Sequence, residues 1–172
     1  YLKAEIHREG KIFVQEYSQG KPYKPVEVTG EAEDTGTMVT FHPDPEIFQV
    51  TTVYKYDTLA ARLRELAYLN KGIHLSLTDR RNLVNDVDEN GNELETQHYR
   101  TDVFYSKEGL REFVDYLDGG AEKLIESPIY LETDKIIPIE IALQYNTSYT
   151  EKIYSYVNNI NTIEGGTHLQ GF

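Results

Sequence analysis

The chain has no cysteine among its 172 residues, no tryptophan and a single methionine. Without cysteine, a disulfide framework and a thiolate zinc site are both excluded. The absence fits the reducing environment of the cytoplasm, which is the compartment we expect. Hydrophobic residues make up 39% of the sequence and aromatic residues 12%, which is enough for a packed core. Intrinsic disorder is therefore not expected.

Basic residues are also scarce, since 17 Lys and Arg stand against 29 Asp and Glu and give a formal net charge of -12. The field around such a chain repels phosphate polyanions on average. Any contact with nucleic acid must then be local, or belong to other parts of a longer protein.

Long apolar runs are missing as well. The runs present are far shorter than the roughly 20 residues that span a bilayer, and no basic and apolar leader opens the sequence. We therefore expect no membrane partner. The sequence starts at Tyr1 in strand-like alternation and stops at Gly171-Phe172 just after a glycine turn. This pattern predicts an internal piece of a longer gene product.

Alternating polar and apolar residues predict most of the strands. Residues 1–8 and 11–17 alternate around Glu9-Gly10, which predicts a β-hairpin with a tight turn. A short strand is expected over 26–28. Residues 37–41 form a β-branched strand that Pro43 and Pro45 close, because proline lacks the backbone donor that a ladder needs.

Two amphipathic helices are predicted from apolar spacing and from their caps. The first starts at Asp57, a candidate N-cap, and ends near Gly72. The second is capped by Ser106 and ends at Gly119-Gly120.

The remaining elements are strands and turns. Residues 73–77 and 96–105 are expected to pair antiparallel across a polar tip at Asn90-Gly91. Two later strands are expected over 136–145 and 151–157, before a turn at 164–166. The sum is an α+β fold with a mostly antiparallel sheet.

No catalytic constellation emerges from the residues alone. Asp86 to Gly91 copies the first half of an EF-hand loop, but the twelfth position is Gln97 in place of the required Glu, so a hairpin tip is the favoured interpretation. None of the five histidines lies in a tight pair with another ligand. Asn146-Thr147-Ser148 matches a glycosylation sequon without a secretory signal, and Gly165-Gly166 lacks the context of a phosphate-binding loop.

Four stretches together closely resemble the ATPase subunits of bacterial type IIA DNA topoisomerases, the family formed by the B subunits of gyrase and of topoisomerase IV. They are Arg8 to Lys11, Thr35 to Asp44, Leu63 to Gly72 and Glu164 to Phe172. The resemblance covers essentially the whole chain. Two further stretches, Tyr156 to Ile160 and Arg62 to Gly72, look more like gyrase than topoisomerase IV.

This resemblance implies the C-terminal half of a GHKL ATPase domain over residues 1–105. The first half of a transducer domain, with the ribosomal-S5-domain-2-like fold, is implied over residues 106–172. Thr37 matches the residue that reaches adenine through a water, Val39 one that lines the adenine pocket, and Arg8 one at the pocket mouth where aminocoumarins bind. These three are the candidate binding residues.

The family's general-base Glu, magnesium-binding Asn, adenine-binding Asp and ATP lid match nothing in this chain, nor does the transducer's Gln-Thr-Lys loop. We therefore expect no catalytic residue and no metal ligand here, and no ATPase activity from the isolated chain. ATP and Mg²⁺ are the cofactors implied for the full-length parent.

The implied partners are the gyrase A subunit in an A2B2 complex, a second B subunit that dimerises on ATP binding, and double-stranded DNA. The alternatives left open are the B subunit of topoisomerase IV and, from a different class, a non-enzymatic acidic interaction module.

Overall fold

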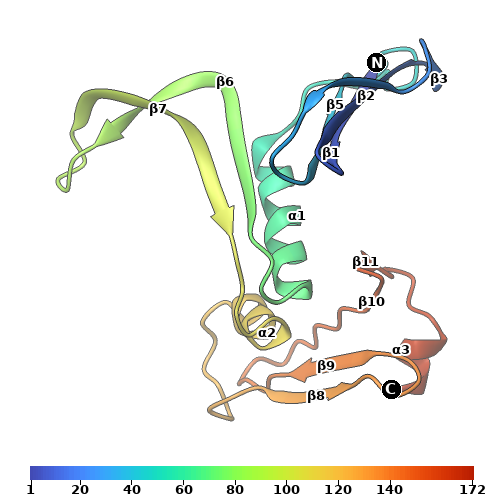
Figure 1. Ribbon diagram of the computed structural model, residues 1–172. Coiled ribbons are helices and arrows are strands. Elements are labelled where there is room, and N and C mark those ends of the chain that lie inside the picture. The colour runs from blue at the N-terminus through green and yellow to red at the C-terminus, as the bar shows by residue number, and fades with distance from the viewer. The chain divides into compact units, whose positions relative to one another are not determined.

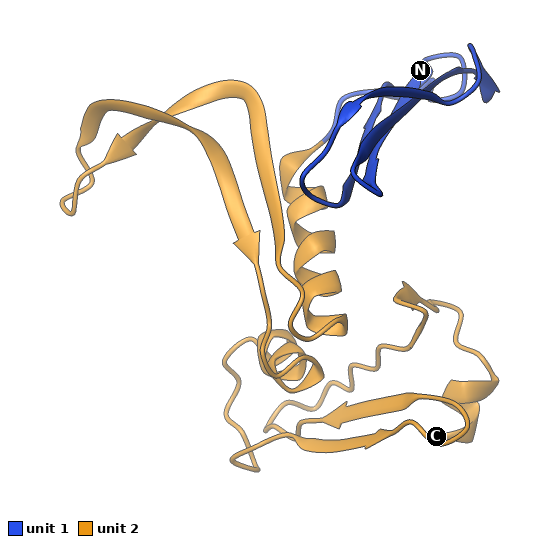
Figure 2. Ribbon diagram, viewed as in Figure 1, with its two compact units in different colours: residues 1–54 blue, residues 55–172 orange.

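An antiparallel sheet makes up most of the first 54 residues of the computed structural model, which describes residues 1–172. Figure 2 colours this unit, residues 1–54, separately from the second, residues 55–172. The strands of the first unit are β1 (Leu2–Arg8), β2 (Lys11–Ser18), β3 (Lys21–Pro22), β4 (Glu27–Glu31) and β5 (Gly36–Phe41). Their order is β3-β2-β1-β5, and β4 also pairs with β2.

The predicted first hairpin is confirmed. β1 and β2 pair from Leu2 opposite Tyr17 to Arg8 opposite Lys11, which leaves Glu9-Gly10 as a two-residue turn. Both turn residues have positive φ, 54° and 74°. A type I′ turn needs this conformation, and its twist matches that of the two strands. The strand expected over 37–41 is β5, whereas the one expected over 26–28 lies slightly later, in β4.

The second unit contains three helices and six strands (Figure 1). They are α1 (Tyr56–Leu69), β6 (Leu75–Val87), β7 (Glu93–Phe104), α2 (Leu110–Asp118), β8 (Ile129–Thr133), β9 (Ile139–Leu143), β10 (Tyr156–Val157), β11 (Ile160–Asn161) and α3 (Thr167–Gly171). The strands pair as three separate antiparallel hairpins, β6-β7, β8-β9 and β10-β11.

Helix α1 packs on the first part of the β6-β7 hairpin. Tyr56, Ala60 and Ala67 on the helix and Phe104 on β7 are buried together, and Leu63, Leu75 and Leu77 pack against them. Burial of this apolar surface is what stabilises the helix, since propensity alone seldom holds three to four turns in water.

The helix ends differ in part from those expected. Asp57 is not the N-cap of α1: the cap position is Lys55, and Asp57 lies in the first turn. The Leu59 N–H donates to the Lys55 carbonyl at 3.2 Å, which closes the first helical turn earlier than expected, and the Tyr56 ring in that turn is buried. At the other end the cap is Asn70, whose side-chain amide donates to the carbonyl of Leu66 at 2.8 Å.

Ser106 is not the N-cap of α2: the cap position is Gly109, and Ser106 lies four residues before the first helical residue, Leu110. Its hydroxyl accepts from the backbone N–H of Gly109 at 2.8 Å and donates to the Glu112 carboxylate at 2.8 Å. Gly119 ends the helix in the left-handed conformation, as expected for a C-terminal glycine.

Two expectations for the last third of the chain are wrong. Of the strand expected over 151–157, only Tyr156–Val157 forms, because residues 151–155 have no neighbouring strand to pair with. β9 is shorter than expected and pairs with β8, which was not predicted. The short helix α3 after the expected glycine turn was also missed. None of the helices is both long and apolar enough to cross a membrane.

Candidate functional site

The three candidate binding residues lie on one face of the sheet in the first unit. Thr37 of β5 pairs with Ile6 of β1, and Val39 pairs with Ala4. Arg8 lies two residues beyond Ile6, so it points to the same side. Residues directly opposite each other in an antiparallel pair share a face, so the register alone brings Arg8, Thr37 and Val39 together. We call this surface the Thr37 face.

The chemistry of the Thr37 face suits a ligand with an apolar ring and a polar edge. Thr37 is exposed and its hydroxyl makes no hydrogen bond within the chain. Val39 is 54% exposed and Ile6 39%, which leaves an apolar surface beside that hydroxyl. Such a surface can stack on a ring while the hydroxyl donates to or accepts from it, directly or through water.

The hairpin end of the Thr37 face carries charged residues of both signs. Arg8 and Lys11 form a cross-strand pair there. The Arg8 guanidinium lies 3.3 Å from the Glu9 carboxylate, and Lys11 is opposite Glu31 of β4. The Arg8 side chain remains 75% exposed, so its fork of donors is free to reach a ligand at this end.

The opposite face of the same sheet is charged and internally paired. His7 lies between Asp34 at 2.6 Å and Glu5 at 3.5 Å, and Glu5 also pairs with Lys3 at 3.0 Å. The hydrogen bond to Asp34 is the main cause that raises the pKa of His7 above its ordinary value. These side chains satisfy one another, so this face offers a ligand less than the Thr37 face does.

A cavity of about 760 Å³ lies at the other end of the first unit. It is formed between the strand ends at Leu2, Ala4 and Phe41 and the loop that includes Phe48 and Tyr54. None of the three candidate residues lines it. The cavity therefore adjoins the Thr37 face through Ala4 but is not the predicted site.

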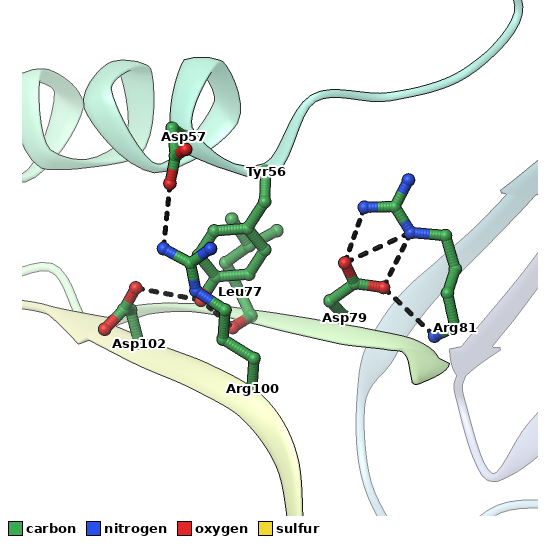
Figure 3. A network of polar contacts seen from close by, with 7 residues as sticks. All are labelled: Tyr56, Asp57, Leu77, Asp79, Arg81, Arg100 and Asp102. Atoms are coloured by element: carbon green, nitrogen blue, oxygen red, sulfur yellow. Dashed lines mark hydrogen bonds and ion pairs between the residues drawn. The ribbon is translucent and has the colours of Figure 1, made fainter. Parts of the chain in front are cut away.

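A network of polar contacts fixes the start of α1 in the second unit (Figure 3). The Tyr56 hydroxyl lies 2.9 Å from the Asp102 carboxylate and 3.2 Å from the carbonyl of Leu77. The Arg100 guanidinium lies 3.8 Å from the centre of the Tyr56 ring and donates to Asp57 at 2.8 Å. These bonds join a helix to both strands of the hairpin, so their role is structural.

Beside this network, Arg81 donates to Asp79 through its side chain and its backbone N–H (Figure 3). These bonds lower the pKa of Asp79 to about 2.

The acidic tip of the β6-β7 hairpin is a turn, as expected. The Asp88 carboxylate accepts from the backbone N–H of Asn90 at 2.9 Å and of Asn92 at 2.8 Å, and Gly91 has a φ of 83°. The Asp88 oxygens are thus bonded to the turn itself, and the Asp86 carboxylate lies 2.6 Å from the His98 ring. No group of three or more His, Asp or Glu side chains in residues 1–172 is placed to hold a metal ion.

One set of contacts was not foreseen from the sequence. Arg62 lies in α1, and Asn70 is the cap at the C-terminal end of that helix. Both bond to Asn159, almost 100 positions later in the chain. No spacing rule predicts such a contact, although Arg62 to Gly72 and Tyr156 to Ile160 are the two stretches that look more like gyrase.

Comparisons with known proteins extend these observations. The family model described as DNA gyrase B matches residues 109–172. The chain is 53% identical to the DNA gyrase B subunit of Eisenibacter elegans over 99% of this chain and 34% of that protein. It is 45% identical to the DNA gyrase B subunit of Halalkalibacterium halodurans over 99% of this chain and 25% of that protein. The chain thus spans about a third of the first relative and a quarter of the second.

A solved structure is similar as well. It is the crystal structure of the 43K ATPase domain of Thermus thermophilus gyrase B in complex with an aminocoumarin, which matches with a TM-score of 0.78 and 34% identity. The match covers 98% of this chain and 42% of that chain. The α+β fold class and the resemblance expected from the sequence are confirmed.

Proposed function

Because the chain belongs to the DNA gyrase B family, we propose that it is part of the ATP-hydrolysing subunit of a bacterial type II DNA topoisomerase. In the full-length protein, ATP binding and hydrolysis would be coupled to DNA strand passage and supercoiling. The names of the relatives favour gyrase over topoisomerase IV and over a non-enzymatic acidic module.

Residues 1–105 are proposed to complete the ATP-binding domain and residues 106–172 to begin the transducer. Two observations support this division. The family model begins its match at residue 109, close to the proposed boundary. Helix α2 begins at Leu110, and Ser106 accepts from the N–H of its N-cap residue Gly109, so a new structural element begins near that boundary.

The placement of Arg8, Thr37 and Val39 on one sheet face is the observation that carries the proposed ligand site. The face fits a nucleotide base, because an unbonded hydroxyl at Thr37 lies beside the exposed apolar surface of Val39 and Ile6. When bound, ATP would supply the phosphoryl group that is transferred. The role of this chain would be to bind and orient the adenine end.

Magnesium fits this chain less well than adenine does. The structure brings no three carboxylate or imidazole ligands together, so the metal would be held by other residues of the longer protein. Phosphoryl transfer depends on metal ions and positioned charges, and we therefore propose that the isolated chain does not hydrolyse ATP.

The proposed partners are the gyrase A subunit in an A2B2 complex, a second B subunit and double-stranded DNA, in the cytoplasm. The net charge of -12 argues against this part of the protein supplying the main DNA contact.

Arg8 offers a direct test of the site in the full-length protein. In the thermophilic relative the ATPase domain binds an aminocoumarin. If Arg8 lies at the mouth of the pocket, Arg8→Ala should weaken novobiocin binding more than binding of a nonhydrolysable ATP analogue, because the adenine lies deeper. Isothermal titration with both ligands would measure the two losses. Equal losses, with unchanged thermal unfolding, would remove Arg8 from the pocket mouth.

A further inference from the structure

The turn between β10 and β11 has an uncommon backbone conformation. Val157 pairs with Ile160, so the two-residue turn is Asn158-Asn159, and both residues have positive φ, 49° and 65°. Asparagine is one of the few residues with a side chain that adopts this region without a large cost. The turn therefore fixes where the backbone carbonyl and the side chain of Asn159 point.

Both polar groups of Asn159 are bonded to the α1 region. Arg62 Nη2 donates to the Asn159 backbone carbonyl at 2.7 Å. The Asn159 side-chain amide donates to Asn70 Oδ1 at 3.0 Å, and Asn70 in turn donates to the carbonyl of Leu66. Arg62 also pairs with Glu65 one turn along the helix, at 2.8 Å. Glu65 thus holds the Arg62 guanidinium in place while the guanidinium donates to Asn159.

An aromatic contact accompanies the polar one. Tyr156 of β10 lies with its ring centre 6.3 Å from that of Phe113, a buried residue of α2. Phe113 stacks on Tyr68 of α1 at 5.2 Å. Helix α1, helix α2 and the β10-β11 hairpin therefore meet around a single ring.

The docked hairpin leads directly into the last residues of the chain. The Thr162 N–H donates to the carbonyl of Ser155 at 2.8 Å, and the Gly165 N–H donates to the carbonyl of Thr162 at 2.8 Å. Helix α3 follows at Thr167. Each step is a short local bond, so the position of the hairpin on α1 sets the position of residues 162–172.

We propose that Arg62 and Asn70 are positioning residues that hold the Asn158-Asn159 turn on α1, and that this contact joins the ATP-binding segment to the later part of the transducer segment. The proposal rests on the proposed function, in which residues 1–105 and 106–172 belong to those two domains. Arg62 is assigned no contact with nucleotide or DNA. It acts through Asn159, and its loss should separate ATP turnover from strand passage.

The contact itself can be tested in the 172-residue chain by hydrogen exchange. Arg62→Ala should speed exchange of the Thr162 amide by about fivefold to tenfold, the loss expected for one net hydrogen bond. Arg80→Ala is the matched control, because Arg80 is exposed, carries the same charge and has no partner. Equal exchange in the two variants would overturn the docking role of Arg62.

The consequence for function needs the full-length B subunit together with the A subunit and DNA. Arg62→Ala should leave the KM for ATP unchanged and lower the number of supercoils introduced per ATP hydrolysed. Arg62→Lys should restore part of that ratio, because a lysine can still donate to the Asn159 carbonyl. A proportional loss of both activities, or a raised KM without a change in the ratio, would overturn the coupling role. Absence of ATP turnover in the unmodified complex would instead refute the proposed function and leave the exchange result standing.

Discussion

The sheet of residues 1–54 and the helix-hairpin core of residues 55–172 differ in how they are stabilised. No residue of the first unit is buried. The second unit buries Tyr56, Ala60, Ala67, Phe104 and Phe113. A small sheet with one open apolar face depends mainly on its strand pairing, whereas apolar burial stabilises the second unit. The side chains on the Thr37 face are therefore available to contact a ligand, whereas the buried side chains of the second unit stabilise its fold.

The largest expected effect of a substitution follows from this contrast. Phe104→Ala should lower the free energy of unfolding by about 3–5 kcal/mol, because it removes a buried ring from the core around Tyr56. Phe41→Ala, at a ring that is 55% exposed, should cost less than about 1 kcal/mol. Urea unfolding of both variants would measure the difference. Similar losses would contradict the contrast between the units.

A smaller effect is expected at the polar network that fixes the start of α1. Tyr56→Phe keeps the buried ring but removes the hydroxyl that donates to Asp102. The loss should be about 1–2 kcal/mol, because the carboxylate then lacks a partner. Tyr99→Phe is a suitable control, since the Tyr99 hydroxyl has no partner and its side chain is exposed. If the two variants unfold at the same urea concentration, the network does not stabilise the helix.

The smallest effect concerns the charged face of the first unit and depends on pH. The pKa of His7 is raised from 6.5 by its hydrogen bond to Asp34, and the pKa of Asp34 is lowered from 3.8 by the same bond. A raised histidine pKa stabilises the fold below about pH 6.5 and the effect is lost as pH rises through the folded value. A lowered aspartate pKa stabilises it above about pH 4 and the effect is lost on acidification. The pair therefore stabilises the sheet mainly between these limits.

An NMR titration of the His7 ring would check this pH dependence. Asp34→Asn should lower the His7 midpoint, because the hydrogen bond to Asp34 is the main cause of its raised pKa. An unchanged midpoint would show that Asp34 does not hold the histidine.

The two units also differ in how much of them could be predicted from sequence. The β1-β2 hairpin was predicted almost residue by residue, because alternation and a Glu9-Gly10 turn are local signals. The pairing of β8 with β9 was not, since Ile129, Tyr130 and Thr133 favour a strand but no local signal identifies its partner. Residues 151–155 are the opposite case, since a strand was predicted there and none forms. A strand-like sequence forms no strand without a partner to pair with.

The candidate site was only partly accessible to the same reasoning. Alternation puts Thr37 and Val39 on the same side of their strand. That Arg8 shares this side depends on the pairing of β5 with β1, which no local pattern specifies. The roles of the three residues came from the family resemblance. The docking of Asn159 on α1 joins positions too far apart for any periodicity to report.

The adenine site is tested most directly by two properties of one variant, Thr37→Val, in the full-length protein. Valine keeps the β-branched shape and removes the hydroxyl, so the free energy of unfolding should stay unchanged. The affinity for a nonhydrolysable ATP analogue should fall by roughly 5- to 150-fold, the cost of one buried hydrogen bond of about 1–3 kcal/mol. Isothermal titration beside thermal unfolding would give both values. Unchanged nucleotide affinity in a normally folded variant would contradict the assignment of the Thr37 face as the adenine site.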